Sequence, residues 1–383
     1  MNRKLRMGMV GGGIGAFIGP VHRMAATLDN EAELVAGAFS SDPKKARASG
    51  EKYHLDPKRV YASYKEMAKA EAALPADERV DFVSIVVPNF GHYDAVKTFL
   101  EAGFNVVCEK PATFSLAEAK QLKKIIQKSG KLFVLTHNYT GYPMVKQARD
   151  IVRSGKLGRL LKVVAEFPQG WMAGLISAPN NGIGRWRMDP KRAGASCCMG
   201  DLGTHAENLV RYITGLEIDT MCAELTSFIP GHKLEDDGNV LIRYKGGARG
   251  ILYASQISAG EENPLAIRVY GEKAGLEWRQ ENPNYLYMSD PSGNFNRYSR
   301  GNGNCCDAAR ANTRLPWGHP EGFIEAFANV YREAFKGIRE IAAGKKNVVV
   351  DAPNIDDGIA GMAFIETCVK STKSKAKWTK LLK

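Results

Sequence analysis

Short apolar runs alternate with amphipathic stretches through the first third of this chain. The runs are rich in β-branched residues and each stops at a turn signal, which is typical of buried strands. They cover residues 5–11, 33–39, 81–87, 104–108 and 131–136. The stretches between them repeat apolar residues at helical spacing, at residues 14–28, 43–53, 93–102 and 115–129. Regular alternation of strand and helix predicts an α/β domain with a parallel, doubly wound sheet.

The pattern changes after about residue 155, where strands become longer and follow one another. We expect strands at 160–167, 240–244, 249–255, 265–270 and 276–279, and helices at 202–214, 320–343 and 355–371. Lys245-Gly246-Gly247-Ala248 is a hairpin signal between two of these strands. The chain is therefore divided into an expected Rossmann dinucleotide-binding domain, residues 1–140, and an α+β domain, residues 141–383, with a mostly antiparallel open sheet. We expect residues 290–315 to be a long loop.

Composition excludes several classes of protein. A hydrophobic fraction of 44% and a charged fraction of 25% over 383 residues are ordinary for a globular chain of about two domains. No apolar run approaches the length of about 18 residues that spans a membrane. The net charge of +12 includes a lysine-rich end, residues 370–383, expected to be a solvated tail, so no nucleic-acid partner is predicted. Seven cysteines without a CxxC pair favour neither disulfides nor zinc, and a cytoplasmic protein is expected.

A glycine-rich turn follows the first predicted strand. Gly11, Gly13 and Ala16 fit the G-x-G-x-x-A spacing, in which the glycines permit a tight turn and close approach of a pyrophosphate. The strand before it and the helix after it are the context that supports a dinucleotide site. Ile14 lies within the same turn.

The segment after the second strand is where a ribose is usually recognised. Asp42 precedes Pro43 and suits a helix N-cap better than a ribose ligand. Ser40 can bind a hydroxyl, and Lys45 can reach a 2′-phosphate. The residues themselves leave NAD and NADP both open.

Polar residues follow the next two strands, at the sheet edge where such folds bind ligands. Pro88 and Asn89 end one strand, with His92 opening the helix beyond, and Asn89 is equally well explained as a turn residue. Glu109 and Lys110 end the other strand. An ammonium group there can polarise a hydroxyl or a carbonyl, although a solvated lysine is the plain alternative.

Asp201 and His205 are four residues apart at the start of a predicted helix, so they share one of its faces. A carboxylate can orient an imidazole and raise its basicity, and histidine suits general-base work near neutral pH. The alternatives are a metal site, for which only two ligands are visible, and an N-cap aspartate beside a core histidine. We predict no metal.

Other candidates are aromatic and forked hydrogen-bonding side chains of the kind found in sugar sites. Trp171, Trp186, Arg187 and Asp189 lie in an irregular stretch that a packed loop with a surface ion pair would explain equally well. Asn138 and Tyr139 follow the fifth strand, and His319 begins the motif His-Pro-Glu-Gly.

These motifs together resemble the Gfo/Idh/MocA oxidoreductase family over essentially the whole chain. The carrying motifs are the glycine turn at 11–16, Val-Pro-Asn at 87–89, Glu-Lys-Pro at 109–111 and Asp-x-x-x-His at 201–205. Residues 17–22, 136–141, 186–190 and 319–323 look like the branch containing levoglucosan dehydrogenase and glycoside 3-dehydrogenases. The resemblance implies NAD, a pyranose hydroxyl at C3, and a homodimer or homotetramer formed through the C-terminal sheet.

The resemblance also implies roles for individual residues. Lys110, Asp201 and His205 form the expected catalytic set. The expected cofactor ligands are Gly11, Gly13, Ile14, Ser40, Lys45, Pro88, Asn89, His92, Glu109, Lys110 and Asn138. The expected substrate ligands are Lys110, Tyr139, Trp171, Arg187, Asp201 and His205. The segment at residues 39–45 lacks a clear NAD-type acid, so the choice of NAD over NADP is the weakest of these transfers.

The sequence therefore predicts an NAD(P)-dependent dehydrogenase acting on a sugar, glycoside or cyclitol, in either direction. One alternative is a glycoside hydrolase of the same family that works by transient oxidation and elimination. The other is a regulator that binds the dinucleotide as a signal; since such a protein would not need Lys110 and His205, this reading ranks last.

Overall fold

The structure is a computed structural model that describes residues 3–178 and 185–383. The chain forms two compact units, and it passes between them three times. Unit 1 comprises Met1–Asn138 and Phe327–Ile359, and unit 2 comprises Tyr139–Ala326 and Ala360–Lys383. One of these passages lies beside the boundary expected at residue 140.

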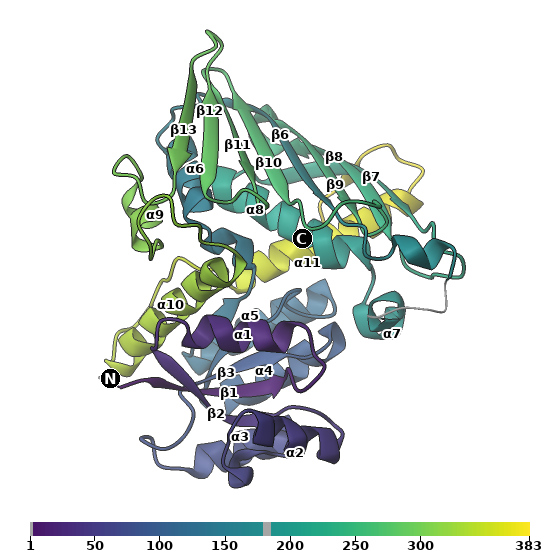
Figure 1. Cartoon of the computed structure of the whole chain (residues 1–383). Coiled ribbons are helices and arrows are strands. Elements are labelled where there is room, and N and C mark those ends of the chain that lie inside the picture. The colour runs from purple at the N-terminus through teal and green to yellow at the C-terminus, as the bar shows by residue number, and fades with distance from the viewer. Residues whose placement is uncertain (1–2, 179–184) are drawn as a thin grey trace. The chain divides into compact units, whose positions relative to one another are not determined.

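Unit 1 is built on a parallel sheet with the strand order β2-β1-β3-β4-β5 (Figure 1). Its strands are β1 Leu5–Gly11, β2 Ala32–Ala38, β3 Phe82–Val86, β4 Asn105–Cys108 and β5 Phe133–Leu135. Its helices are α1 Ile18–Thr27, α2 Pro43–Lys52, α3 Tyr64–Ala73, α4 His92–Glu101 and α5 Leu116–Ser129. Most of α10 Phe323–Ala342 and the start of α11 Ile355–Lys373 also belong to this unit. The predicted doubly wound domain is confirmed.

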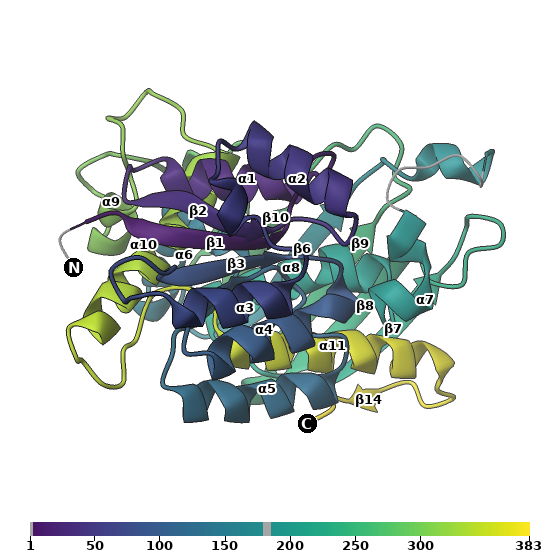
Figure 2. The ribbon, with the colours of Figure 1, turned by 90° about the horizontal axis from the view of Figure 1, so that it is seen from below.

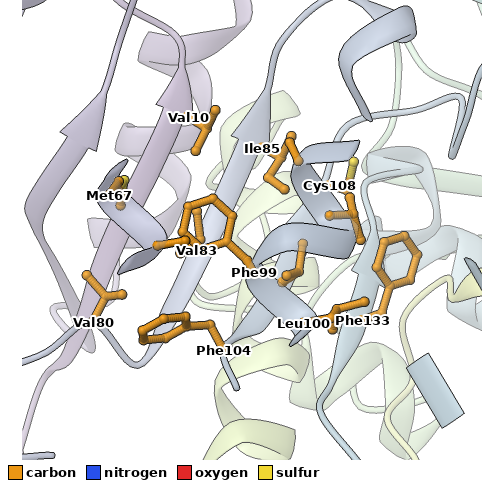
Figure 3. Packing of buried hydrophobic residues seen from close by; sticks show 14 of the residues in the cluster. Val10, Met67, Val80, Val83, Ile85, Phe99, Leu100, Phe104, Cys108 and Phe133 are labelled. Carbon is orange, nitrogen blue, oxygen red and sulfur yellow. The ribbon is translucent and has the colours of Figure 1, made fainter. Parts of the chain in front are cut away.

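Helices cover both faces of this sheet, because side chains of a strand alternate between its faces. Val83 and Ile85 pack into an apolar cluster with Phe99 and Leu100 of α4 (Figure 3). Phe82 and Ser84 point the other way and contact Tyr331 of α10. Figure 2 shows α3, α4 and α5 along one side of the sheet and α1 along the other. The carboxyl ends of the strands are left to carry polar groups.

Local signals placed several helix ends correctly. The Asp42 carboxylate accepts hydrogen bonds from the backbone N–H groups of Lys44 and Lys45, so it caps α2 as predicted. Ser115 caps α5 through the Glu118 N–H, and Gly130 ends that helix with a φ of 63°. The sequence prediction missed α3, although Ser63 caps it in the same way, through the Glu66 N–H.

The predicted start of the first helix was wrong. Gly12 and Gly15 have φ angles of 67° and 82°, which a right-handed helix excludes, so α1 begins at Ile18 instead of residue 14. A Cβ on Gly19 would lie 2.5 Å from the Cα of Gly12. Gly19, and not Ala16, is therefore the small residue that lets this helix pack against the turn.

Unit 2 contains a nine-stranded sheet with the order β13-β12-β11-β10-β6-β9-β8-β7-β14. Its strands are β6 Leu160–Pro168, β7 Ile218–Thr226, β8 Asp237–Tyr244, β9 Arg249–Ser255, β10 Ala266–Gly271, β11 Gly275–Arg279, β12 Tyr285–Ser289, β13 Phe295–Ser299 and β14 Thr379–Lys380. Its helices include α6 Pro143–Arg153, α7 Pro190–Ala193, α8 Thr204–Thr214 and α9 Asp307–Ala311. Among the described residues the paired strands are antiparallel except β6 with β9, which confirms the predicted mostly antiparallel sheet.

One face of this sheet is covered, and the other is exposed. Along β8, Val240 and Ile242 are buried whereas Leu241 between them is exposed. The covering helices include α6 and α8, as Figure 1 shows. The hairpin predicted at residues 245–248 joins β8 to β9.

Two expectations for this half of the chain were wrong. Residues 290–315 are not one long loop, because they contain β13 and α9. The lysine-rich end is not wholly solvated, because β14 pairs with β7 and the Arg243 guanidinium lies 3.8 Å from the Trp378 ring centre. Pairing of the C-terminal strand with a strand far away in the sequence leaves no local pattern.

Three further observations concern the described residues as a group. No helix among them combines the length and apolarity needed to cross a bilayer. None of the seven cysteines is in a disulfide, and burial raises the pKa of the Cys108, Cys197, Cys198 and Cys368 thiols. No three histidine, cysteine or acidic side chains within residues 3–178 and 185–383 gather closely enough to hold a metal ion.

Candidate active site

The dinucleotide turn lies where the strand order of unit 1 reverses, between β1 and β3. A Cβ on Gly11 would lie 2.5 Å from the Val86 carbonyl oxygen, and Gly11 itself has a φ of 77°. A Cβ on Gly13 would lie 2.8 Å from the Ser49 Oγ and 3.0 Å from the Phe39 carbonyl oxygen. Only glycine fits either position, so bare backbone is presented at the place where this fold binds a dinucleotide.

Side chains from α1 and α2 and from Tyr53 hold this turn, and none of them was predicted from the sequence. The Ser49 hydroxyl accepts a hydrogen bond from the Ile14 N–H at 3.0 Å. The Gly12 carbonyl accepts from Arg23 Nη1 at 3.1 Å and from the Tyr53 hydroxyl at 3.3 Å. The Arg23 guanidinium also lies 3.7 Å from the centre of the Tyr53 ring. These partners come from separate helices, so no local motif joins them.

The segment expected to meet the ribose carries no available acid. The Asp42 carboxylate caps α2, and the Ser40 hydroxyl accepts the Asp42 N–H at 3.1 Å. Lys45 is exposed, and its Nζ lies 3.8 Å from the position of a Cβ on Gly15. The Lys45 ammonium group is therefore directed at the glycine turn, where an anionic group of the cofactor would lie.

His92 ties together the segments that follow β3 and β4. Its two ring nitrogens lie 2.7 Å from the Pro111 carbonyl oxygen and 2.9 Å from the Val87 carbonyl oxygen. Burial lowers the pKa of His92, against the opposing effect of these two backbone contacts. The structure thus uses both nitrogens to fix backbone beside Pro88 and Lys110, whereas the sequence suggested a direct cofactor ligand.

Glu109 is the centre of a buried polar network in unit 1. Its Oε1 lies 2.9 Å from His22 Nε2 and accepts the Thr136 hydroxyl at 2.6 Å. His22 Nδ1 lies 2.6 Å from the Tyr331 hydroxyl, which in turn lies 2.7 Å from the Ser84 Oγ. This network fixes the residue that precedes Lys110.

Burial would raise the pKa of Glu109, but contacts with His22, Lys110 and Thr136 outweigh it and hold that pKa below its ordinary value. A carboxyl whose pKa is depressed in the folded state stabilises the fold above its unfolded pKa, and this stability is lost as the pH falls towards the folded pKa. We therefore expect wild-type stability to fall more steeply than that of Glu109→Gln between about pH 5 and pH 3. Urea denaturation at each pH measures the two slopes.

Glu101→Gln is the matched control, because it removes an exposed carboxyl at the end of α4. Its stability should follow the wild-type pH dependence. Equal slopes for wild type and Glu109→Gln would contradict the assigned role of the buried carboxylate.

Lys110 lies two residues beyond the end of β4 and is partly buried, and its peptide bond to Pro111 is cis. Asn138, at the end of the first segment of unit 1, is buried, and its Nδ2 has no hydrogen-bond partner among the described residues. A buried amide donor without a partner and a glycine turn that no side chain can fill both fit a bound dinucleotide. The residues expected to hold NAD in unit 1 are therefore compatible with it.

Asp201 lies in a π-helical turn, Met199–Gly203, which precedes α8 in unit 2. Its Oδ2 accepts hydrogen bonds from Arg187 Nε and from Gln256 Nε2, both at 3.1 Å. π-Turns of this kind recur at functional sites. The carboxylate is thus held by a cation and an amide, and Gln256, just beyond β9, is a site residue that the sequence did not reveal.

Buried groups behind this turn hold it in place. The Glu235 carboxylate accepts hydrogen bonds from the Ser196 hydroxyl and, at 3.0 Å, from the Met199 N–H. The Ser196 Oγ accepts the Gly200 N–H at 3.0 Å. Burial raises the pKa of Glu235 despite these hydrogen bonds. Ser196 and Glu235 were not anticipated either, because their role depends on contacts across 39 residues of sequence.

His205 is in the first turn of α8, where its ring packs against aromatic side chains. The Tyr139 ring meets it edge to face at 4.8 Å, and the Phe167 ring lies 6.3 Å away. His205, Tyr139 and Phe167 are all buried. The structure therefore brings His205, Tyr139, Asp201 and Arg187 together around the start of α8, as their predicted roles require.

The remaining aromatic and acidic candidates are less concentrated. Trp186 is stacked beneath the Arg187 guanidinium at 4.6 Å, which combines the predicted aromatic plane and forked donor. Asp189 caps the short helix α7 through the Lys191 N–H, so it has a structural role. Trp171 is exposed in the turn after β6.

Comparison with known proteins agrees with this geometry. Residues 5–139 match the oxidoreductase-family NAD-binding Rossmann fold, and residues 145–277 match the GFO/IDH/MocA C-terminal domain. An oxidoreductase structure from Sinorhizobium meliloti is 45% identical, with a TM-score of 0.88 and coverage of 99% of this chain and 100% of that one. An inositol dehydrogenase homolog from Azotobacter vinelandii, complexed with NAD+, is 33% identical, with a TM-score of 0.94 and coverages of 99% and 98%. The chain belongs to the Gfo/Idh/MocA oxidoreductase family, with an NAD-binding Rossmann domain.

The chain is also similar to levoglucosan dehydrogenase from Pseudarthrobacter phenanthrenivorans. The two are 24% identical over 318 residues, which cover 77% of this chain and 78% of that protein. The family resemblance expected from the sequence motifs is confirmed.

Proposed function

We propose that this protein is an NAD-dependent dehydrogenase that oxidises a ring hydroxyl of a sugar, glycoside or cyclitol, at C3 where the ring is a pyranose. The observation that carries the proposal is the Asp201 carboxylate, held by Arg187 and Gln256 at the start of the helix that presents His205. Likeness to an inositol dehydrogenase homolog and to levoglucosan dehydrogenase supports the substrate class.

In this proposal, unit 1 binds the cofactor and unit 2 binds the substrate, which corresponds to the expected division at residue 140. Gly11, Gly13 and Ile14 hold the pyrophosphate with their backbone, with Ser40 and Lys45 beside it. Pro88, Asn89 and Asn138 complete the cofactor set, and His92 and Glu109 hold the backbone beside Pro88 and Lys110 in place. Bound NAD supplies a hydride acceptor. NAD is preferred over NADP because it is the cofactor bound in the Azotobacter vinelandii homologue.

The chain's own residues handle the proton. His205 takes the hydroxyl proton as general base, and the Lys110 ammonium stabilises the developing negative charge on the same oxygen. Asp201 orients His205 and accepts a substrate hydroxyl. Arg187, Tyr139 and Trp171 bind other hydroxyls of the ring. A polyhydroxylated ring suits such a site because it offers both donors and acceptors to these side chains.

The proposal extends to the assembly and its compartment. Leu241 and Ile251 are paired across β8 and β9 and exposed on the same face of the sheet, and Val164 of β6 is in register with Ile251. Tyr270 of β10 adds a further exposed apolar side chain on the same sheet. Apolar side chains gathered on one face mark an interaction surface, so we assign it to a homodimer or homotetramer. Light scattering gives the mass of the assembly and so tests whether it is a dimer or a tetramer.

Seven cysteines outside disulfides suit a cytoplasmic enzyme.

The direct test is a screen of pyranoses, methyl glycosides and inositols with NAD and then NADP, followed by the absorbance of reduced cofactor. We expect reduction of NAD with at least one of these classes. Absence of reduction with every substrate and both cofactors would contradict the proposal. Release of a chromogenic aglycone without net reduction would instead favour the hydrolytic alternative.

A further inference from the structure

Unit 2 contains a recess near its candidate catalytic residues. It is a cavity of about 1110 Å³ at the β11–β13 end of the sheet, bounded by the loop at residues 315–322. This volume is slightly above the usual size of small-molecule sites, about 300–1,000 Å³. The lining includes the amides of Asn263, Gln280 and Asn284, the rings of Tyr285 and Trp317, and the carboxylates of Glu262, Glu281 and Glu321.

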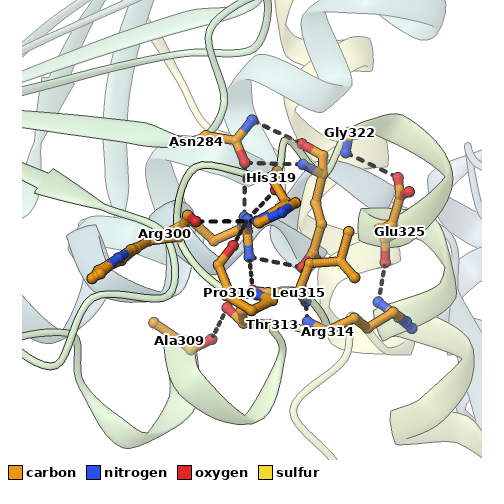
Figure 4. A network of polar contacts seen from close by, with 12 residues as sticks. Asn284, Arg300, Ala309, Thr313, Arg314, Leu315, Pro316, His319, Gly322 and Glu325 are labelled. Atoms are coloured by element: carbon orange, nitrogen blue, oxygen red, sulfur yellow. Dashed lines mark hydrogen bonds and ion pairs between the residues drawn. The ribbon is translucent and has the colours of Figure 1, made fainter.

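A buried arginine, together with Asn284 and Glu321, holds the loop that forms one wall (Figure 4). Arg300 is 3% exposed and uses all five of its N–H donors. They bind Asn284 Oδ1, Glu321 Oε1 and the carbonyl oxygens of Leu315, Pro316 and His319. The loop therefore has a fixed backbone, although the Trp317 side chain that it carries is 55% exposed.

Two buried acceptors of the lining have no partner within the described part of the chain. They are Gln280 Oε1 and Glu321 Oε2. The other atoms of these groups are engaged: Gln280 Nε2 donates to the Tyr142 hydroxyl at 3.4 Å, and Glu321 Oε1 accepts from Arg300 and two backbone N–H groups. A buried acceptor without a donor is costly, so both atoms call for a ligand or water that donates hydrogen bonds.

The charges of the lining favour a neutral ligand. Arg300 is paired with Glu321 at 2.8 Å and has no donor left for a phosphate. Glu281 accepts the Asn263 N–H at 2.9 Å, and the Arg297 guanidinium stacks 4.8 Å from the centre of the Tyr285 ring. Hydroxyl groups match the unpaired acceptors, and an exposed indole matches the apolar C–H face of a pyranose.

One aromatic side chain separates this cavity from His205. The Tyr139 ring lies 4.8 Å from His205 on one side and 6.4 and 6.0 Å from Tyr142 and Phe323 on the other. Tyr142 and Phe323 line the cavity, and Asn263 Nδ2 donates to the Tyr139 hydroxyl at 3.4 Å. A single aromatic ring, that of Tyr139, therefore lies between the cavity and the His205 imidazole.

We propose that this cavity is a second sugar subsite, which binds the neighbouring ring of a glycoside whose first ring is oxidised beside His205. Trp317 stacks on the second ring, while Gln280 and Glu321 accept its hydroxyls. The inference rests on the proposed dehydrogenase function for the first ring. It narrows the substrate class from free sugars to glycosides with at least two rings.

The test compares kcat/KM of wild type and Trp317→Ala for a disaccharide and for the methyl glycoside of the same first ring. We expect Trp317→Ala to lower kcat/KM for the disaccharide about tenfold more than for the methyl glycoside. Phe228→Ala, which removes an exposed aromatic side chain outside the cavity, should lower neither. Equal losses for both substrates, or no loss, would overturn the second subsite.

Binding without turnover separates this inference from the proposed function. In calorimetry of the full chain with maltose and cellobiose, wild type should bind one of them at least about tenfold more tightly than Trp317→Ala does. Such a difference in a protein that oxidises no sugar would retain the subsite and reject the dehydrogenase. Dehydrogenase activity with no effect of Trp317→Ala on disaccharide binding would reject the subsite alone.

Discussion

Replacing Lys110 by alanine is expected to lower kcat about 10³-fold, because the developing negative charge on the substrate oxygen would lose the cation proposed to stabilise it. The dissociation constant for NADH should change by less than about threefold, since the glycine turn and its supporting residues are untouched. Stopped-flow or steady-state rates with the best substrate of the screen give the first value. Calorimetry with NADH gives the second.

Lys124→Ala is the control, because Lys124 is an exposed lysine on α5 of the same unit. It should keep the wild-type rate. Retention of activity within tenfold by Lys110→Ala would contradict the assignment. A loss of NADH binding as large as the loss of kcat would also contradict the assignment, because Lys110 would then act mainly by binding the cofactor.

Replacing Arg300 by methionine is expected to lower the free energy of unfolding by about 3–5 kcal/mol, because it leaves the buried Glu321 carboxylate without its cation. The variant also loses the hydrogen bonds from Arg300 to Asn284 Oδ1 and to the carbonyl oxygens of Leu315 and Pro316. Urea denaturation followed by tryptophan fluorescence measures the loss. Adding Glu321→Gln to Arg300→Met should recover part of it, since the uncompensated charge is then absent.

Arg297→Met is the matched control for this experiment. Arg297 is exposed and stacks on Tyr285, so its removal should cost less than about 1 kcal/mol. A loss for Arg300→Met as small as that of Arg297→Met would contradict the view that this arginine fixes the loop.

The features that the sequence predicted well are those that depend on a few neighbouring residues. Asp42 before Pro43 marked a helix cap, and Lys245 to Ala248 marked a hairpin, because both signals are complete within four or five positions. The alternation of apolar runs was enough for the parallel sheet of unit 1. Strand ends then indicated where Asn89 and Lys110 would lie.

The features that were missed depend on contacts between distant segments. The first helix starts late because Gly12 and Gly15 take left-handed angles, which follow from the close approach of Gly19 to the turn. Gln256 reaches Asp201 from a different element, and no spacing rule connects them. Asp201 and His205 were expected on one face of a single helix. In the structure Asp201 lies in a π-helical turn and His205 in the α-helix that follows, and a helical repeat in the sequence does not reveal this change.

Whether Lys110 and His205 act on the same substrate hydroxyl is most directly tested by combining Lys110→Ala with His205→Ala. Residues that serve one chemical step lose their effects together, so the double variant should be slower than the worse single variant by less than about tenfold in kcat. Rate losses that multiply, each variant reducing kcat by the same factor whether or not the other is present, would contradict a shared role for the two side chains.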